Sequence, residues 1–257
     1  MVKITFLGTC SGTEPMKGRH QSSFVIEAGE RYYWFDAGEN CSYAAYTGGI
    51  DVSRIRAIFI SHMHIDHVGG LANLLFLIRK LVWVTGKPHI NDNSYDVFVP
   101  DLEIFRMIKG VSTTNCSRVE TMTINEHRVC DGVIFEDENI RVTAVHNTHL
   151  GEVSDGEWRS FSFLIESQGK RIVFSGDVGA PEELDPLMEG GCDALIMETG
   201  HHKLDKVFSY ANERGVRKLL FTHHGREVLY DEERARRLAA TEHPDAKICD
   251  DGDVVVL

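Results

Sequence analysis

A short segment with three histidines and one aspartate constrains this chain more than any other feature. Residues Ser61–Leu71 read Ser-His-Met-His-Ile-Asp-His-Val-Gly-Gly-Leu and follow the apolar run Ala57–Ile60, which is typical of a strand. A helical pattern of apolar residues over Gly69–Val82 comes next. The segment is therefore predicted to form a short loop at the carboxyl end of a strand, where α/β folds commonly bind ligands.

The spacing of these side chains predicts a metal site. His62 and His64 alternate, so an extended backbone points both imidazoles to the same side. Asp66 and His67 follow in the turn that leads into the helix. Imidazole and carboxylate ligands suit zinc, iron or manganese. The alternative is a polar helix start with incidental histidines, which so many ligands at this spacing disfavour.

Three further predicted strands end in histidine or aspartate close to a glycine. They lead into His146-Asn147-Thr148-His149, Gly176-Asp177-Val178-Gly179 and His223-His224-Gly225. One segment cannot complete the ligand spheres of two metals, so we expect further ligands at these strand ends. A capping aspartate or a surface histidine would explain any one of them alone, but together with the first segment they favour a shared site.

The order of predicted elements favours a layered α/β protein. Short β-branched and apolar runs read as strands and alternate with helical patterns, and the second half of the chain loosely repeats the first. Residues 85–130 are the least patterned and contain Pro88, Asn91 and Pro100. We expect this region to form an insertion or a cover over one edge.

Composition narrows the partners and the location. The chain has 27 Lys and Arg against 39 Asp and Glu, a formal net charge of −12, which disfavours dedicated nucleic-acid binding. None of the six cysteines forms a Cys-x-x-Cys pair, and the N-terminal residues do not read as a signal peptide, so we expect free thiols in the cytoplasm. The apolar stretch Leu71–Val84 is too short and too polar to predict a membrane span.

These residues carry a resemblance to a known family. Segment 62–67, with Gly-Asp at 176–177 and Thr-His at 222–223, resembles the metallo-β-lactamase superfamily. Phe6-Leu7-Gly8-Thr9 and Phe35-Asp36-Ala37-Gly38-Glu39 are similar to its ribonuclease Z-like branch, which includes phosphodiesterases. The resemblance implies one hydrolase domain over 1–257, folded as a four-layer αββα sandwich of the metallo-β-lactamase type. It also implies two divalent metal ions between the sheets, zinc first and manganese or iron as alternatives.

The resemblance assigns the ligands residue by residue. One metal would bind His62, His64 and His149; the other would bind Asp66, His67 and His223; Asp177 would bridge them. The family's spacing prefers His149 to His146 and His223 to His224. His146 and His224 are then expected to support the ligands or to touch the substrate.

Two departures from the family pattern favour a small substrate. The tRNA-processing enzymes carry a long arm where this chain has only four residues between Glu166 and Arg171. Their proton-donating histidine is replaced by Met197, so His201 or His202 is expected to supply the proton. Together with the acidic charge, these departures predict that tRNA is an unlikely substrate.

The resemblance implies that a metal-bridging hydroxide, oriented by Asp66, attacks a small phosphodiester or a cyclic nucleotide. The predicted catalytic residues are Asp66, His201 and His202. An acyl hydrolase acting on lactones, thioesters or lactams is the alternative on the same site, followed by a non-hydrolytic di-iron or ligand-binding protein. The sequence leaves a homodimer open.

Two loops offer candidates for substrate contact. In the loop 151–159, Trp158 stacking on a base and Arg159 pairing with a phosphate are one interpretation, but an acidic surface hairpin with a half-buried tryptophan is favoured. Arg19 and His20 lie in a loop that the resemblance places near the metals, and their roles stay open.

Overall fold

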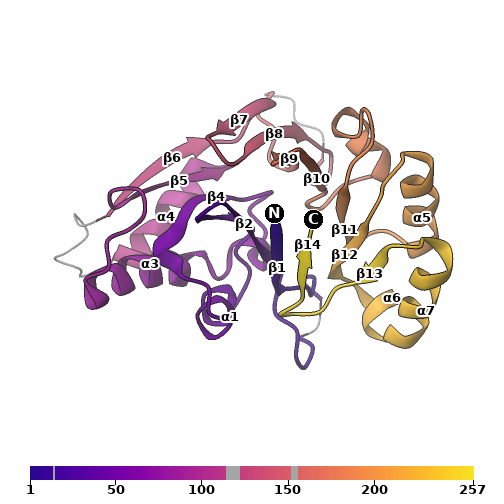
Figure 1. The fold of residues 1–257 in the computed structure, drawn as a ribbon, viewed down its shortest axis with the longest axis horizontal. Helices are drawn as coiled ribbons and strands as arrows, with labels where there is room; N and C mark the ends of the chain where they lie inside the picture. The colour runs from indigo at the N-terminus through magenta and orange to yellow at the C-terminus, as the bar shows by residue number, and fades with distance from the viewer. Residues whose placement is uncertain (14, 114–121, 152–155) are drawn as a thin grey trace.

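Two seven-stranded β-sheets pack face to face and carry helices on their outer faces (Figure 1). The computed structural model describes residues 1–257 except 14, 114–121 and 152–155. The layers run helix, sheet, sheet, helix, which confirms the predicted αββα sandwich.

The first sheet has the order β14-β1-β2-β3-β4-β5-β6. Its strands are β1 (Lys3–Gly8), β2 (Ser23–Ala28), β3 (Arg31–Phe35), β4 (Ile55–Phe59), β5 (Ser94–Val99), β6 (Thr123–Arg128) and β14 (Val254–Val256). Strands β3 to β6 are parallel to one another, so their carboxyl ends share one edge.

The second sheet has the order β13-β12-β11-β10-β9-β8-β7. Its strands are β7 (Gly132–Glu136), β8 (Arg141–His146), β9 (Phe161–Ser167), β10 (Lys170–Phe174), β11 (Ala194–Thr199), β12 (Leu219–His224) and β13 (Ala246–Ile248). Strands β10 to β13 are parallel, and their carboxyl ends also lie together.

Helices cover the two outer faces (Figure 1). The first half of the chain forms α1 (Cys41–Thr47), the 3₁₀ turn η1 (Val52–Arg54), α2 (Ile65–Val68), α3 (Leu71–Thr85) and α4 (Leu102–Thr113). The second half forms the 3₁₀ segment η3 (Pro181–Leu187), α5 (Leu204–Glu213), α6 (Arg226–Leu229) and α7 (Glu232–Glu242). Apolar side chains of each set pack on the outer face of the adjacent sheet.

Aromatic rings fill the space between the sheets. Phe59 stacks between Phe35 and Phe98, with ring centroids 5.0 Å away on both sides. Phe24 of the first sheet meets Phe174 of the second edge-to-face at 4.9 Å. These rings are almost completely buried, and each buries a large apolar area that holds the two halves of the chain at a defined separation.

The expectation that residues 85–130 form an insertion or a cover is wrong for the described part of that range. It supplies β5, α4 and β6, which extend the first sheet by two strands. The sequence pattern did not indicate these strands for two reasons. β5 contains the buried Asp96, and β6 does not alternate regularly between apolar and polar residues. Asp96 is tolerated because Arg56 and His127 pair with it.

The short connection predicted between β9 and β10 is confirmed. Ser167 pairs with Lys170, so only Gln168 and Gly169 link the two strands. Both have positive φ, 50° and 74°, as a tight hairpin turn requires. The long arm of the tRNA-processing enzymes is expected at this place.

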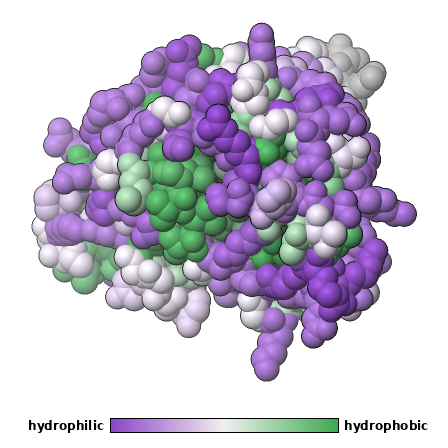
Figure 2. All heavy atoms as spheres, turned by 45° about the vertical axis from the view of Figure 1, so that its right-hand side comes forward, coloured by the Kyte–Doolittle hydropathy of each residue, from purple (hydrophilic) through white to green (hydrophobic). Residues whose placement is uncertain are grey.

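One stretch, Ile65–Thr85, is long and apolar enough by length and composition to cross a membrane. It forms α2 and α3, contains the buried Asp66 and His67, and packs on the first sheet, as core helices do. The face shown in Figure 2 is mostly hydrophilic, with a broad hydrophobic patch left of its centre and smaller ones elsewhere. Patches of this kind are typical of contact sites, but the homodimer stays a prediction.

Candidate metal centre

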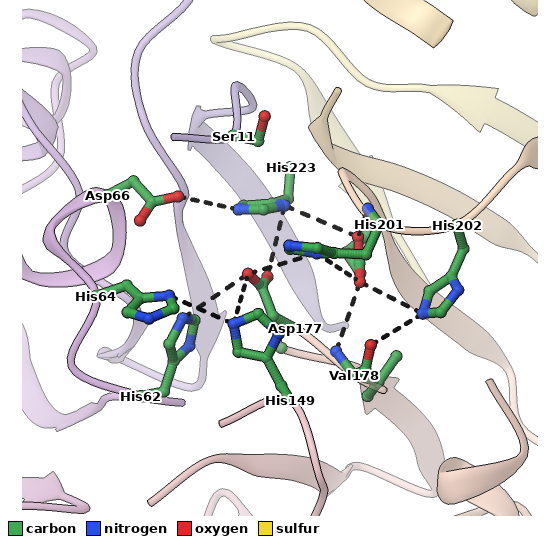
Figure 3. Close-up of polar contacts among 12 residues, drawn as sticks. Ser11, His62, His64, Asp66, His149, Asp177, Val178, His201, His202 and His223 are labelled. Atoms are coloured by element: carbon green, nitrogen blue, oxygen red, sulfur yellow. Dashed lines mark hydrogen bonds and ion pairs between the residues drawn. The ribbon is translucent and has the colours of Figure 1, made fainter. Parts of the chain in front are cut away.

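The residues predicted as metal ligands meet where strands of both sheets end (Figure 3). His62 and His64 follow β4, Asp177 follows β10, and His223 lies at the end of β12. An isolated bridge between His62 and Ser160 joins the two sheets directly at this point. The fold therefore brings together side chains that lie more than a hundred residues apart in sequence.

Three groups of side chains have ligand atoms within 4.8 Å of one another. They are His62, His64, His149 and Asp177; Asp177, Glu198, His201 and His223; and Asp66, His67 and His223. Asp177 and His223 each belong to two groups, so the groups form one continuous cluster rather than separate sites.

Asp177 lies at the centre of the cluster. Its Oδ2 atom is 3.7 Å from Nε2 of His62 and 3.6 Å from Nε2 of His149. Its Oδ1 atom is 3.4 Å from Nε2 of His67 and 3.4 Å from Nδ1 of His223. The two oxygens thus face different groups of imidazoles, an arrangement suited to a carboxylate between two cations.

Several buried atoms of the cluster lack a hydrogen-bond partner within the described residues. They are Nε2 of His62, Nε2 of His67, Oδ1 of Asp177 and Nδ1 of His223. Buried polar atoms are rarely left unpaired, since each costs free energy. Imidazole nitrogens and carboxylate oxygens in this position are donors for divalent metal ions, so the residues present fit the metals that the fold family implies.

Asp36 positions the cluster, a role that its place in the segment Phe35-Asp36-Ala37-Gly38-Glu39 did not indicate. Its carboxylate accepts hydrogen bonds from the backbone N–H of Ser61 at 2.7 Å and from the Ser61 hydroxyl at 2.8 Å. It also lies 2.7 Å from Nδ1 of His67. This contact leaves Nε2 of His67 facing the cluster, as a carboxylate behind a metal-binding histidine does. The available signal was an aspartate directly after an apolar strand.

Two glycines that the sequence analysis did not single out make room for the ligands. A Cβ atom on Gly12 would lie 2.8 Å from Oδ2 of Asp66, and one on Gly200 would lie 2.7 Å from Nδ1 of His223. His223 itself has φ 48°, a left-handed conformation that aims its ring into the cluster.

The charges of the cluster shift its pKa values in a consistent pattern. Burial would raise the pKa of Asp66, but its hydrogen bond with His223 and the charge of His67 lower it to about 2. Burial likewise opposes ionisation of Asp177, yet His223 and His67 hold its pKa well below the usual range. Burial lowers the pKa of His62. The carboxylates of Asp177 and Asp36 overcome the effect of burial on His67 and raise its pKa well above the usual range.

His146 and His224 lie outside the cluster, whereas their neighbours His149 and His223 lie within it. His146 Nδ1 is 2.7 Å from Oδ2 of Asp131. The buried ring of His224 bonds through Nε2 to the carbonyl oxygen of Cys249 at 2.9 Å. Burial lowers the pKa of His224 to about 3, so it is a neutral structural side chain.

Arg19 and His20 form hydrogen bonds and ion pairs with other segments of the chain and do not belong to the cluster. Arg19 donates to the Thr9 hydroxyl at 2.6 Å and to the carbonyl oxygen of Cys249 at 3.0 Å, and it pairs with Asp250 at 2.7 Å. His20 Nδ1 lies 2.8 Å from Asp251. These bonds tie the loop before β2 to the segment that follows β13.

His201 and His202 differ in their surroundings. His201 Nδ1 lies 3.1 Å from Oε1 of Glu198 and 3.7 Å from Oδ2 of Asp177. His202 Nε2 donates instead to the carbonyl oxygen of Val178 at 2.9 Å. Met197 packs in the apolar layer under the helices, because neighbouring residues of β11 point to opposite faces.

Comparison with known protein families matches residues 2–238 to the family described as anti-Pycsar protein Apyc1. The chain belongs to this family. It is also 33% identical to the ribonuclease Z of Prochlorococcus marinus (strain MIT 9303) over 156 residues, which cover 58% of this chain and 45% of that protein. The match thus spans about half the length of such curated relatives.

Two solved structures have a similar fold. Human tRNase Z, short form, superposes with a TM-score of 0.73 at 20% identity, and YhfI of Bacillus subtilis, a metallo-β-lactamase fold protein, with 0.76 at 19%. Each comparison covers 99% of this chain and 98% of the other. The predicted membership of the metallo-β-lactamase superfamily and its ribonuclease Z-like branch is confirmed. The names of these relatives give no support to the expectation that tRNA is an unlikely substrate.

Replacing Asp36 by asparagine is expected to weaken zinc binding about 10- to 100-fold, because the amide no longer fixes the ring of His67. Competition with a chromogenic chelator measures the dissociation constant. Asp96→Asn is the matched control, since Asp96 contacts His127 at 2.8 Å away from the cluster. Equal affinities of the two variants would contradict the positioning role of Asp36.

Metal binding is expected to release a proton from His67. Its raised pKa means that the metal-free ring is protonated below that pKa, so zinc affinity increases with pH, by at most about tenfold per unit, and levels off above it. Titration calorimetry in two buffers of different ionisation enthalpy counts the protons released. An affinity that does not change between about pH 6 and 8 contradicts this expectation.

Proposed function

We propose that this protein is a metal-dependent hydrolase that cleaves small phosphodiesters, with cyclic nucleotides as the first candidates. The observation that carries the proposal is the convergence of imidazoles on both oxygens of the buried Asp177. Two divalent metal ions bound there, zinc first and manganese or iron as alternatives, would activate a water and stabilise negative charge on the phosphate oxygens.

The side chains of the cluster have different roles in this proposal. One metal would be held by His62, His64 and His149 and the other by Asp66, His67 and His223, and Asp177 would serve both; these residues belong to the groups with ligand atoms close together. Asp66 is anionic because its pKa is about 2, and its Oδ2 atom lies 3.1 Å from Nε2 of His223. An anionic oxygen at this place can also accept a hydrogen bond from the attacking water and orient it.

His201 is the proposed proton donor to the leaving group. Its hydrogen bond with Glu198 raises the pKa of the imidazole, so the ring carries a proton closer to neutral pH. Its side chain is 43% exposed and reaches the cluster beside Asp177, where a leaving oxygen has access to it. His202 is held by the carbonyl oxygen of Val178, so we assign it a positioning role beside Glu198.

Two features support a small substrate over a folded RNA. The hairpin at Gln168-Gly169 leaves no arm between β9 and β10, and the net charge of −12 repels a polyanion. Because relatives of this chain are named ribonuclease Z, precursor tRNA is nevertheless included among the substrates to be tested. The family description extends the proposal to an action against a Pycsar system.

The proposal includes one hydrolase domain over residues 1–257 that acts in the cytoplasm. The described cysteines, Cys10, Cys41, Cys130, Cys192 and Cys249, are all free thiols, which suits a reducing compartment; Cys116 lies outside the described residues.

The test compares substrate classes on protein loaded with zinc, manganese or iron. Cyclic nucleotides and bis-p-nitrophenyl phosphate are expected to be hydrolysed, while lactones, thioesters and precursor tRNA serve as competing substrates. Turnover of an acyl substrate or of precursor tRNA, without any turnover of the small phosphodiesters, would replace the proposal by that activity.

His201→Asn is expected to lower kcat for a cyclic nucleotide about 10²- to 10⁴-fold, because the leaving alkoxide loses its proton donor. With bis-p-nitrophenyl phosphate the loss is expected to be much smaller, since p-nitrophenolate leaves without protonation. Metal content, measured by elemental analysis, is expected to stay unchanged. His127→Asn on β6 is the matched control, and equal losses on both substrates would contradict the role of His201.

A further inference from the structure

A cavity lies beside the metal centre on the same edge of the two sheets. It has a volume of about 460 Å³ and is lined by residues that include Arg128, Cys130, Asp131, Glu157, Trp158 and Phe161. We call it the Trp158 pocket. Its volume is typical of small-molecule sites.

The topology connects this pocket to the metal cluster. Arg128 ends β6, which lies two strands from β4 in the first sheet, or roughly 10 Å along the shared carboxyl edge. On the other side, the backbone N–H of Phe161 donates to the carbonyl oxygen of Ser61, next to His62. A ligand bound at the cluster can therefore extend into the pocket.

A rigid aromatic surface lines the pocket. The ring of Trp158 is stacked on the imidazole of His146, with centroids 3.9 Å apart and planes at 13°. Asp131 fixes His146 twice, through the backbone N–H at 2.8 Å and through Nδ1 at 2.7 Å. Trp158 also packs against the core between the sheets, so the orientation of its ring is determined before any ligand binds.

The charges around this surface indicate which part of a ligand it suits. Arg128 and Glu157 pair at 2.8 Å, and the side chain of Asp131 is half exposed, so the rim carries more negative than positive charge. A phosphate is disfavoured there, whereas a flat heterocycle can stack on Trp158 and offer hydrogen-bond donors and acceptors to the rim. The phosphate of a nucleotide belongs instead at the metal cluster.

We propose that the Trp158 pocket binds the nucleobase of a nucleotide substrate whose phosphodiester lies at the metal centre. This inference rests on the proposed phosphodiesterase function and makes Trp158 a determinant of specificity for nucleotides over other phosphodiesters. It replaces the surface-hairpin interpretation that the sequence favoured for Trp158; residues 152–155 of that loop lie outside the described residues.

The test uses two substrates that share a leaving group and differ only in the nucleoside: thymidine 5′-p-nitrophenyl phosphate and methyl p-nitrophenyl phosphate. Trp158→Ala is expected to lower kcat/KM for the thymidine ester about 5- to 100-fold, the usual effect of losing one base–aromatic stack. The methyl ester is expected to react at the wild-type rate. Trp158→Phe is expected to recover most of the difference because it keeps an aromatic face.

Trp83→Ala is the matched control, because Trp83 is a half-exposed tryptophan on α3, outside the pocket. A binding measurement accompanies the kinetics: equilibrium dialysis of thymidine 5′-monophosphate, with inorganic phosphate as the base-free ligand. Trp158→Ala is expected to weaken nucleotide binding and to leave phosphate binding unchanged.

The outcomes separate the two proposals. If the wild type hydrolyses neither ester, the dialysis alone decides whether the pocket binds a base. The phosphodiesterase proposal falls only if cyclic nucleotides and bis-p-nitrophenyl phosphate are not hydrolysed either. If the wild type hydrolyses the esters but Trp158→Ala leaves both rates unchanged, or lowers both equally, the pocket proposal is overturned.

Discussion

The structure depends on a buried carboxylate between two groups of imidazoles. Asp177 is almost completely buried, and its oxygens lie 3.4–3.7 Å from five histidine nitrogens. A buried charge is tolerated only where opposite charge or hydrogen bonds compensate it. The cluster meets this condition with imidazoles held in defined orientations. Its buried atoms without a hydrogen-bond partner indicate that bound cations provide the rest of the compensation. Asp36, Gly12 and Gly200 are the positions at which the surrounding fold maintains this arrangement.

The arrangement of the two sheets brings these imidazoles and Asp177 together. The phenylalanine layer sets their separation, and the bridge between His62 and Ser160 brings the ends of β4 and β9 together. Parallel strands in both halves end at one edge, so hydrolysis and substrate recognition share that edge under our proposals. The metal cluster lies where parallel strands of the two sheets end, and the Trp158 pocket lies between the end of β6, the residues that lead to β7, and the start of β9.

The sequence predicted most strands and helices because their apolar patterns are local. The runs that became β4, β10 and β12 are apolar and are each followed by a ligand-type residue near a glycine, and the structure contains all three strands. The sequence did not predict β5 or β6. β5 contains the buried Asp96, and such a strand becomes recognisable only when the distant partners of its aspartate are known. Asp96 pairs with Arg56, which lies forty residues away in sequence.

By itself the sequence determined the αββα sandwich through the metallo-β-lactamase resemblance. It also determined that the site is made of metal-type ligands, because the identity and spacing of the ligand residues can be recognised within short segments. The resemblance already preferred His149 to His146, but only the tertiary structure distinguished His201, which lies beside Asp177, from His202, which bonds to the carbonyl oxygen of Val178. Neighbours of this kind differ only in side-chain direction, which packing across the two sheets determines. The same holds for Asp36 and for the stack of Trp158 on His146: both contacts join residues from different segments, so no local pattern encodes them.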